Sequence, residues 1–476
     1  MSSRPWPSLS PVVPAVVVLV AAMAGLAALG DPADRLPAAL GLLALAAAAW
    51  AIACRRLEAV APTLGRRHLL LAILAVGLVV RLPLLALPPT LSDDLLRYLW
   101  DGRVLAAGAD PWSLAPEAAE LSFLRDDLWQ RLPHRQVPTV YPPLALVGFS
   151  LAAALPAPIL AWKGLLTLAD LAACAALVAL ARRRGLPAAR AAWYAWSPLV
   201  ALEIAGLGHV DGLGVAAAVV AVLALSPPAV DGSGSAGRRG AVLAALAAAA
   251  GILLKLAPAA ALGLWARTAR RPLLFVTLAL ALAAAGLVPV VLAVGGVPAG
   301  LATYGIAWEF AGPVYEPLWR LVERSSLDHA AVALLDLAER SSGWRLSLDA
   351  LYPFAYPQLL AKLLLAVGAL AVVLRSFTDR DPIAGGRRLF GGLLICSATV
   401  YPWYLLWVMP WAALSRHTPW LLAAALAPLL YLPRLPGVEL FPGVWAAVWG
   451  PPLLLVLLAG RRNVAAAEGT GGGDGR

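Results

Sequence analysis

Long uninterrupted apolar runs alternate with short charged segments along almost the whole chain. Runs close to twenty residues long include 11–29, 36–54, 68–87, 159–181 and 272–294, and others follow towards the C-terminal end. A helix of about twenty apolar residues spans the hydrocarbon core of a bilayer. Because the runs are continuous rather than alternating, they predict transmembrane helices and exclude a transmembrane β-barrel. We therefore expect an all-α polytopic membrane protein with about 12 to 14 crossings.

The distribution of charge predicts which loops lie on which side of the membrane. Arginines lie in clusters between the apolar runs, and such clusters normally face the cytoplasm. More than half of the carboxylates lie in two long loops, 88–140 and 295–353, which are then extracytoplasmic. We expect a single membrane domain over 1–462 and a disordered tail over 463–476. The arginine clusters are Arg55/Arg56/Arg66/Arg67, Arg182/Arg183/Arg184/Arg190, Arg238/Arg239, Arg267/Arg270/Arg271, Arg375/Arg380/Arg387/Arg388 and Arg461/Arg462.

Composition supports a membrane protein and narrows its partners. Of 476 residues, 61% are hydrophobic and 13% are charged, with a mean hydropathy of +0.80, whereas a soluble domain carries about twice that charge. The net charge of +10 alone would fit nucleic acid, but the arginines follow the membrane topology, so we expect no nucleic-acid partner. The three cysteines lie in apolar runs and predict no disulfide framework or metal cluster. Abundant alanine indicates a GC-rich bacterial genome, so we expect these spans to lie in a bacterial plasma membrane.

Two apolar segments do not fit a single crossing. Tyr141–Leu155 is short and begins Tyr-Pro-Pro, so we expect a juxtamembrane or re-entrant helix with both ends outside. The segment 241–266 has arginines at both ends, with Lys255 and Pro258 near its middle. We expect two half-spans that meet near Lys255, since broken helices are tolerated where protein or a wet cavity covers the freed backbone groups.

The first outer loop opens with the charged segment LSDDLLRYLWDGRVLAAGADPW, residues 91–112. Ser92 is a suitable N-cap, with Asp93 and Asp94 in the first turn, and Arg97 and Asp101 continue the polar face. The pattern predicts an amphipathic juxtamembrane helix with its apolar side on the membrane. The acids are either caps and ion-pair partners or functional groups. A functional carboxylate would accept a proton from a hydroxyl, and a pair of carboxylates would hold a divalent cation.

Ionisable side chains inside apolar runs are costly and point to function. Glu203, His209 and Asp211 surround the turn EIAGLGHVDG, either as a site or as a polar loop at the membrane interface. Lys255 lies at the predicted helix break, where it either pairs with Asp170 or binds a phosphate in an outward cavity.

Aromatic residues supply further candidates, and nucleotide motifs are missing. Tyr141 and Tyr401 precede prolines and suit either the interfacial belt or a site. Trp112, Trp308 and Trp319 lie in the outer loops, where a tryptophan can stack on a sugar ring. The sequence has no Walker loop, no GxGxxG after a strand and no Cys/His metal spacing. A transferase of this kind would therefore take a donor that is already borne by the membrane.

The order of motifs resembles a known family. Ser-Asp-Asp, RYLWDGRVLAAGADPW and YPPL come first, and GHVDG, LLKLAP and YPWYLLWVMP follow. This order resembles the polyprenyl-phosphate-sugar-dependent membrane glycosyltransferases of the GT-C fold, and especially their bacterial mannosyltransferase-like branch. The resemblance covers nearly the whole chain. Ala109-Asp110-Pro111-Trp112 departs from the usual Asn-Pro-Tyr of that stretch, which puts the contacts with sugar or acceptor in question.

The resemblance implies a mechanism and a set of roles. Asp93 or Asp94 would deprotonate an acceptor hydroxyl as it attacks the anomeric carbon, with inversion and release of polyprenyl phosphate. The sugar would be mannose or a related hexose, the acceptor a lipid or glycan, and the active face extracytoplasmic. The candidate cations for the donor phosphate are Arg97, Arg103, His209 and Lys255.

Two other functions remain open at this point. A transporter or lipid flippase also uses broken helices and charges near the membrane midplane, although the sequence shows no inverted repeat. A ligase or polymerase of lipid-linked glycans would use a similar donor.

Overall fold

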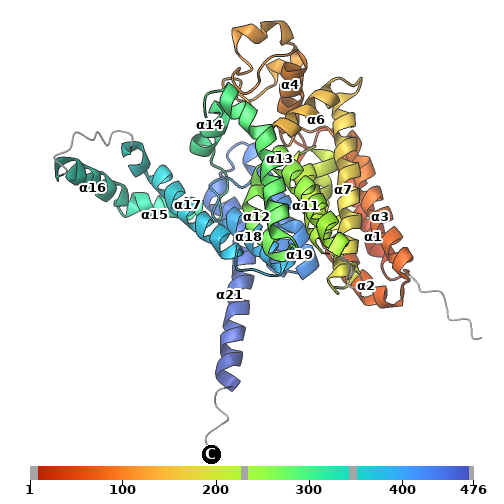
Figure 1. Ribbon diagram of the computed structural model, residues 1–476. Helices are drawn as coiled ribbons and strands as arrows, with labels where there is room; N and C mark the ends of the chain where they lie inside the picture. Colours follow the sequence, from red (N-terminus) through yellow and green to blue (C-terminus); the bar gives the residue numbers. More distant parts are fainter. Residues whose placement is uncertain (1–8, 227–233, 342–350, 471–476) are drawn as a thin grey trace, which may run out of the picture.

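The chain folds into a helical bundle that carries helical loops at one end (Figure 1). The structure is a computed structural model that describes residues 9–226, 234–341 and 351–470. Extended pairing in these residues is limited to two isolated bridges, from Phe310 and from Ala311 to Thr399. The prediction of an all-α polytopic membrane protein is confirmed.

The α-helices differ widely in length. They are α1 (Val13–Ala28), α2 (Leu36–Val60), α3 (Arg66–Arg81), α4 (Asp94–Ala106), α5 (Asp127–Gln130), α6 (Pro143–Ala153), α7 (Pro158–Arg183), α8 (Ala192–Ala195), α9 (Pro198–Ala201), α10 (Asp211–Leu225), α11 (Gly234–Leu254), α12 (Leu262–Thr268), α13 (Pro272–Ala293), α14 (Ala299–Ala307), α15 (Tyr315–Arg324), α16 (Leu327–Ser341), α17 (Pro357–Ser376), α18 (Pro382–Ile395), α19 (Met409–Ser415), α20 (Thr418–Leu426) and α21 (Trp445–Thr470). Short 3-10 turns lie at Ala61–Thr63, Leu82–Ala86, Ala119–Leu124, Ala188–Ala191, Ala257–Ala261, Tyr352–Ala355, Pro402–Trp407 and Ala427–Arg434, and π turns at Leu202–Gly206 and Leu440–Val444. Of the tail that was expected to be disordered, residues 463–470 continue α21, and residues 471–476 lie outside the described residues.

Seven helices of the described chain are long and apolar enough to cross a membrane, fewer than the 12 to 14 crossings expected. An eighth span results if Pro198–Gly206 and Asp211–Leu225, which are bent by 119°, cross together. The difference arises because several apolar runs are divided into short helices. Pro198, for example, follows the end of α8, and proline lacks the N–H that would continue a helix. The seven are Leu36–Thr63, Arg66–Ala86, Pro158–Arg183, Gly237–Leu254, Pro272–Ala293, Pro357–Ser376 and Leu440–Leu458.

The helix break predicted near Lys255 is confirmed, but its two sides are unequal. α11 ends at Leu254, and the turn Ala257–Ala261 leads into the seven-residue α12. Gly237–Leu254 is long enough to cross on its own, so the prediction of two short half-spans is wrong for the first of them. Lys255 therefore lies at the end of a full-length helix, where the chain turns back.

The two long loops meet at one end of the bundle, the top of Figure 1, where α4 and α14 both lie. Gly300 of α14 faces the backbone of the first loop. A Cβ at this position would lie 2.3 Å from the Pro138 carbonyl oxygen and 2.6 Å from that of Thr139. Such close approach requires glycine, and it joins two loops that are far apart in the sequence.

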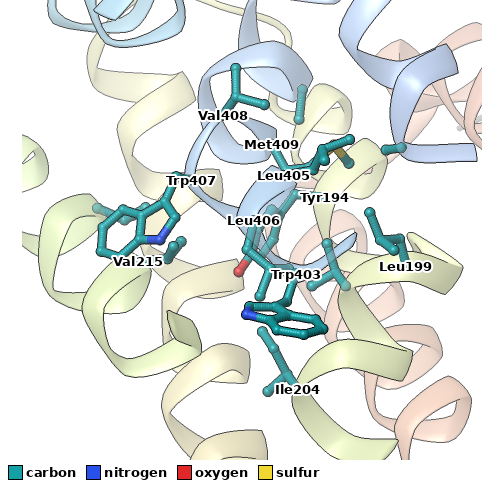
Figure 2. Close-up of a cluster of buried hydrophobic side chains, with 14 of the residues drawn as sticks. Tyr194, Leu199, Ile204, Val215, Trp403, Leu405, Leu406, Trp407, Val408 and Met409 are labelled. Atoms are coloured by element: carbon teal, nitrogen blue, oxygen red, sulfur yellow. The ribbon is translucent and has the colours of Figure 1, made fainter. Parts of the chain in front are cut away.

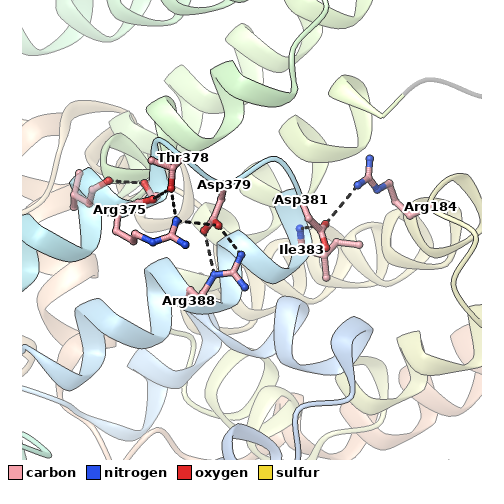
Figure 3. Close-up of polar contacts among 9 residues, drawn as sticks. Arg184, Arg375, Thr378, Asp379, Asp381, Ile383 and Arg388 are labelled. Carbon is pink, nitrogen blue, oxygen red and sulfur yellow. Dashed lines mark hydrogen bonds and ion pairs between the residues drawn. The ribbon is translucent and has the colours of Figure 1, made fainter. Parts of the chain in front are cut away.

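Arginine clusters from distant parts of the chain also meet. Figure 3 shows Arg184, just after α7, reaching Asp381 before α18, with Nη2 and Oδ1 3.5 Å apart. Beside it, the Asp379 carboxylate accepts hydrogen bonds from Arg388 at 2.7 and 3.1 Å. The Arg182 guanidinium donates to the carbonyl of Arg66 at 2.5 Å. Three of the clusters that the sequence assigned to one side of the membrane therefore lie together.

The helix predicted in the first outer loop is confirmed as α4, but it starts one residue later than expected. Asp93 is its N-cap residue and Asp94 its first helical residue, so Ser92 lies outside it. Ser92 still supports this end, since its hydroxyl accepts the Asp94 N–H at 3.3 Å.

Protein covers the apolar face of α4, so the prediction that this face lies on the membrane is wrong. Gly102 packs against α6, where a Cβ would lie 2.4 Å from the carbonyl carbon of Phe149. Leu99, Trp100 and Val104 form a small core with apolar residues that follow in the same loop. α4 is thus held by packing on α6 and on its own loop.

The segment Pro402–Trp407 comes late in the sequence but packs among helices from the N-terminal half of the chain. Figure 2 shows its tryptophans, Trp403 and Trp407, among Tyr194, Ile204 and neighbouring apolar side chains. The two halves of the sequence therefore share one core, and this core supports the floor of the cavity described next.

Candidate active site

A cavity of about 660 Å³ collects residues from every motif that the sequence singled out. Its walls come from the start of α4, the start of α10, the break after α11, the second long loop and the Tyr-Pro-Trp-Tyr turn. The sequence-predicted candidates on these walls are Asp93, Asp94, Arg97, Tyr141, Asp211, Lys255 and Tyr401.

The two adjacent aspartates have different surroundings. Asp94 is half-buried, and its Oδ2 accepts a hydrogen bond from the Tyr98 hydroxyl at 3.3 Å. Burial raises the pKa of the Asp94 carboxyl, the positive charge of Lys255 opposes this shift, and the negative charge of Asp211 adds to it. Asp93 is exposed, with its Oδ2 3.9 Å from Nη2 of Arg434. Asp94 is thus the more enclosed carboxylate.

Lys255 faces the same cavity as Asp94. Its Nζ lies 3.0 Å from Oδ2 of the buried Asp211, whose Oδ1 accepts the indole N–H of Trp407 at 2.7 Å. The ammonium also lies over the rings of Tyr141 and Tyr404, at 5.7 and 5.4 Å from their centroids. An ammonium has three N–H donors, so Lys255 can bind an anion while it keeps its contact with Asp211.

The alternative pairing of Lys255 with Asp170 is wrong. Asp170 is fully buried and lies 2.6 Å from Nη2 of Arg81. It also accepts a hydrogen bond from the Tyr194 hydroxyl at 2.7 Å. These two partners already satisfy Asp170 inside the bundle.

Arg97 and Asp101 form a structural pair. Arg97 Nε donates to Oδ1 of the buried Asp101 at 2.8 Å, and Arg97 Nη2 donates to the Val137 carbonyl at 2.7 Å. Arg97 therefore ties α4 to the loop that covers it. Arg103 is not on the cavity wall, because its Nη1 lies 2.6 Å from Oδ2 of Asp126 on the outer surface.

Glu203, His209 and Asp211 are all fully buried, so the prediction of a polar interfacial loop is wrong. His209 lies in the bend before α10, and Gly208, with φ +79°, supplies the left-handed residue that this bend needs. Both nitrogens of the His209 ring have partners, Ser92 on one side and Glu203 on the other. His209 therefore lies behind the cavity wall rather than on it.

Four rings form a continuous stack that supports the wall. Phe310 stacks on Tyr401, Tyr401 on Trp403, and Trp403 on His209, with ring centroids 4.6, 4.5 and 4.0 Å apart. The interplanar angles are 15°, 1° and 12°. The stack links the second long loop to the buried histidine.

The outer tryptophans are not equivalent. Trp308 lines the cavity, and its ring lies 4.6 Å from that of His134, so it bridges the two long loops. Trp112 donates to the Tyr141 carbonyl at 3.0 Å, and Trp319 lies against Arg320. Of the three tryptophans proposed to stack on a sugar, only Trp308 is on the cavity wall.

Several residues of the cavity wall were not predicted from the sequence. Arg434 donates to the Thr90 carbonyl at 2.8 Å and lines the cavity. A signal for it was available, since Arg434 stands outside every arginine cluster. Tyr404 and Trp407 were not named individually, although they lie in the motif YPWYLLWVMP. Other missed polar or aromatic wall residues carry no comparable signal: His134, Tyr304 and Tyr431.

The carboxylates of Asp93 and Asp94 contact different residues, whereas a pair that holds one divalent cation points at a common centre. In the part of the chain that the structure describes, no three His, Cys, Asp or Glu side chains gather as metal ligands. Asp93 is near Arg434, whereas Asp94 accepts from Tyr98.

The fold and the cavity define a multi-pass membrane protein with a carboxylate and a lysine in one partly apolar cavity. A family model described as alpha-(1->6)-mannopyranosyltransferase, N-terminal domain, matches residues 13–271, more than half of the chain. The chain belongs to this family of GT-C membrane mannosyltransferases, and the resemblance noted in the sequence is confirmed. Neither the curated proteins nor the solved structures gave a match. The matched range includes α4, the His209 bend and Lys255.

Proposed function

We propose that the protein transfers mannose from a polyprenyl-phosphate donor to an acceptor hydroxyl, on the extracytoplasmic face of a bacterial plasma membrane. Asp94 acts as the general base. The observation that carries this assignment is the shared cavity of Asp94 and Lys255, a proton acceptor and a cation in one chamber. Apolar side chains such as Leu393, Leu394 and Leu430 also line the chamber and suit a lipid-linked substrate.

The reaction is a single displacement. The Asp94 carboxylate takes the proton of the acceptor hydroxyl while that oxygen bonds to the anomeric carbon. The bond from this carbon to the phosphate oxygen breaks, and its electron pair leaves with polyprenyl phosphate. Because one displacement inverts the anomeric centre, an α-(1→6) product requires a donor with a β-linked mannosyl phosphate.

Cations stabilise the departing phosphate. Lys255 faces the cavity with its side chain 24% exposed, and Arg434, which follows much later in the sequence, lines the same cavity with 38%. Arg97 serves to position the loop, His209 supports the wall, and Arg103 lies outside. The donor phosphate thus binds at Lys255 and Arg434.

Purified variants test the assignment of Asp94. Asp94→Asn removes the base and keeps the shape, so we expect transfer from polyprenyl-phosphate mannose to fall by about a hundredfold or more. Asp93→Asn is the matched neighbour and should retain most of the activity, and Arg103→Gln controls for charge changes away from the cavity. Wild-type activity in Asp94→Asn would overturn the proposal.

A further inference from the structure

A buried network that begins in the cavity wall and extends behind it ends at the start of α4. It consists of Ser92, His209, Glu203 and Tyr431, and we call it the His209 network. His209 Nε2 lies 3.0 Å from Ser92 Oγ, and His209 Nδ1 lies 3.1 Å from Glu203 Oε2. The Tyr431 hydroxyl donates to Glu203 at 3.0 and 3.2 Å.

The contacts of the four groups give their hydrogen bonds one consistent direction. The Tyr431 hydroxyl donates to the Glu203 carboxylate. His209 Nδ1 lies 3.1 Å from both the carbonyl oxygen and Oε2 of Glu203, which are acceptors, so Nδ1 is the ring nitrogen that donates. In this tautomer His209 Nε2 accepts from the Ser92 hydroxyl. The Ser92 oxygen keeps a lone pair for the Asp94 N–H, which lies 3.3 Å away. Every donor in this series has an acceptor.

The network is also rigid. Its three inner side chains are almost fully buried, with Ser92 4% exposed and His209 and Glu203 0%. The His209 ring lies against Trp403 at 4.0 Å, nearly parallel to it. The His209 backbone N–H donates to the Glu203 carbonyl at 3.0 Å. The imidazole therefore has little freedom to move.

We propose that Ser92, His209 and Glu203 are positioning residues that hold the first turn of α4, and with it the Asp94 carboxylate, in its reactive place. The inference rests on the proposed role of Asp94. The network connects three separate parts of the sequence, around Ser92, His209 and Tyr431, and it ends at the backbone N–H of Asp94. Its loss lets the base shift within the cavity, and a shift of about 1 Å is enough to cost roughly a hundredfold in rate.

The test uses the full chain in detergent, with turnover normalised to the concentration of donor-binding sites. Ser92→Ala and Tyr431→Phe each remove one hydroxyl, and Ser92→Thr restores the hydroxyl at position 92. We expect kcat to fall roughly ten- to a hundredfold in Ser92→Ala, with donor KM within about twofold and partial recovery in Ser92→Thr. Ser113→Ala, an exposed serine bonded to Asp110, is the matched control and should behave as wild type.

The pH profile separates positioning from a general loss of structure. A positioning defect moves the acidic limb of kcat/KM, because the surroundings of Asp94 change. A purely structural defect lowers Tm and the number of binding sites and leaves normalised kcat and the acidic limb unchanged, which would overturn the inference. The charged and titratable groups around the network are Asp94, Asp211, Lys255 and Arg434.

Asp94→Asn, measured beside these variants, keeps the two proposals distinguishable. An active Asp94→Asn would refute the proposed function. An inactive Asp94→Asn together with fully active Ser92→Ala and Tyr431→Phe would refute the positioning role alone.

Discussion

At the residue scale, the enclosure of Asp94 predicts a pH dependence. Burial raises the pKa of this carboxyl. A general base works only when deprotonated, so activity is lost as pH falls through the raised pKa. We expect the acidic limb of kcat/KM to lie above about pH 4, the ordinary range of an aspartate. A rate profile between mildly acidic and neutral pH measures it, and a limb at or below the ordinary value would contradict the enclosed-base account.

The neighbours of Asp94 should move that limb in opposite directions. The positive charge of Lys255 lowers the pKa of Asp94, and the negative charge of Asp211 raises it. Lys255→Gln should therefore shift the acidic limb to higher pH, and Asp211→Asn to lower pH. The same kcat/KM profiles measure both shifts, and shifts of the same sign in the two variants would show that the limb does not report on Asp94.

At the element scale, α4 depends on its close contact with α6. A Cβ at Gly102 would lie 2.4 to 2.7 Å from backbone atoms of Phe149 and Ser150. Gly102→Ala should lower stability by about 1–3 kcal/mol, because neither backbone can give way cheaply. Gly164 of α7 is the control, since a Cβ there meets nothing within 4 Å. Thermal unfolding in detergent compares the two variants, and equal Tm values would contradict the observed packing.

The contact between α14 and the first loop predicts an effect on substrate binding. Gly300→Ala would push α14 away from Pro138 and Thr139, and Trp308 lies on the same stretch of chain. We expect donor KM to rise several-fold, because α14 and the first loop together cover the cavity and would separate. Gly305→Ala in the same helix is the control and should stay near wild type, since a Cβ there meets nothing within 4 Å. Steady-state kinetics on both variants would show this. An unchanged KM in Gly300→Ala would mean that the contact between α14 and the first loop does not contribute to donor binding.

At the scale of the whole molecule, local sequence patterns predicted individual helices and breaks, but they did not predict which distant residues meet. The charged segment at Asp94 and the break at Lys255 were predictable, because amphipathic spacing and proline act over a few residues. The partner of Lys255 was not, since Asp211 lies 44 residues away and the sequence suggested Asp170 in its place. Arg434 meets Thr90 across 344 residues, a contact that only the folded bundle creates.

The number of spans was overestimated for a related reason. Apolar runs record hydrophobicity but not whether a helix continues through them. The bend of 119° between Pro198–Gly206 and Asp211–Leu225 falls at the turn EIAGLGHVDG, where two apolar runs form at most one crossing, and it brings His209 behind the cavity. The same irregularity that reduced the number of crossings therefore built the site.

The role of Asp94 as the general base is tested most directly by measuring donor binding and the transfer step separately in Asp94→Asn. Equilibrium binding of polyprenyl-phosphate mannose is measured first, and single-turnover transfer to acceptor second, both against wild type. If Asp94 is the base, Asp94→Asn should bind the donor within about threefold of wild-type affinity, and its transfer rate should fall by about a hundredfold or more. A transfer rate equal to that of wild type would contradict the assignment of Asp94 as the base.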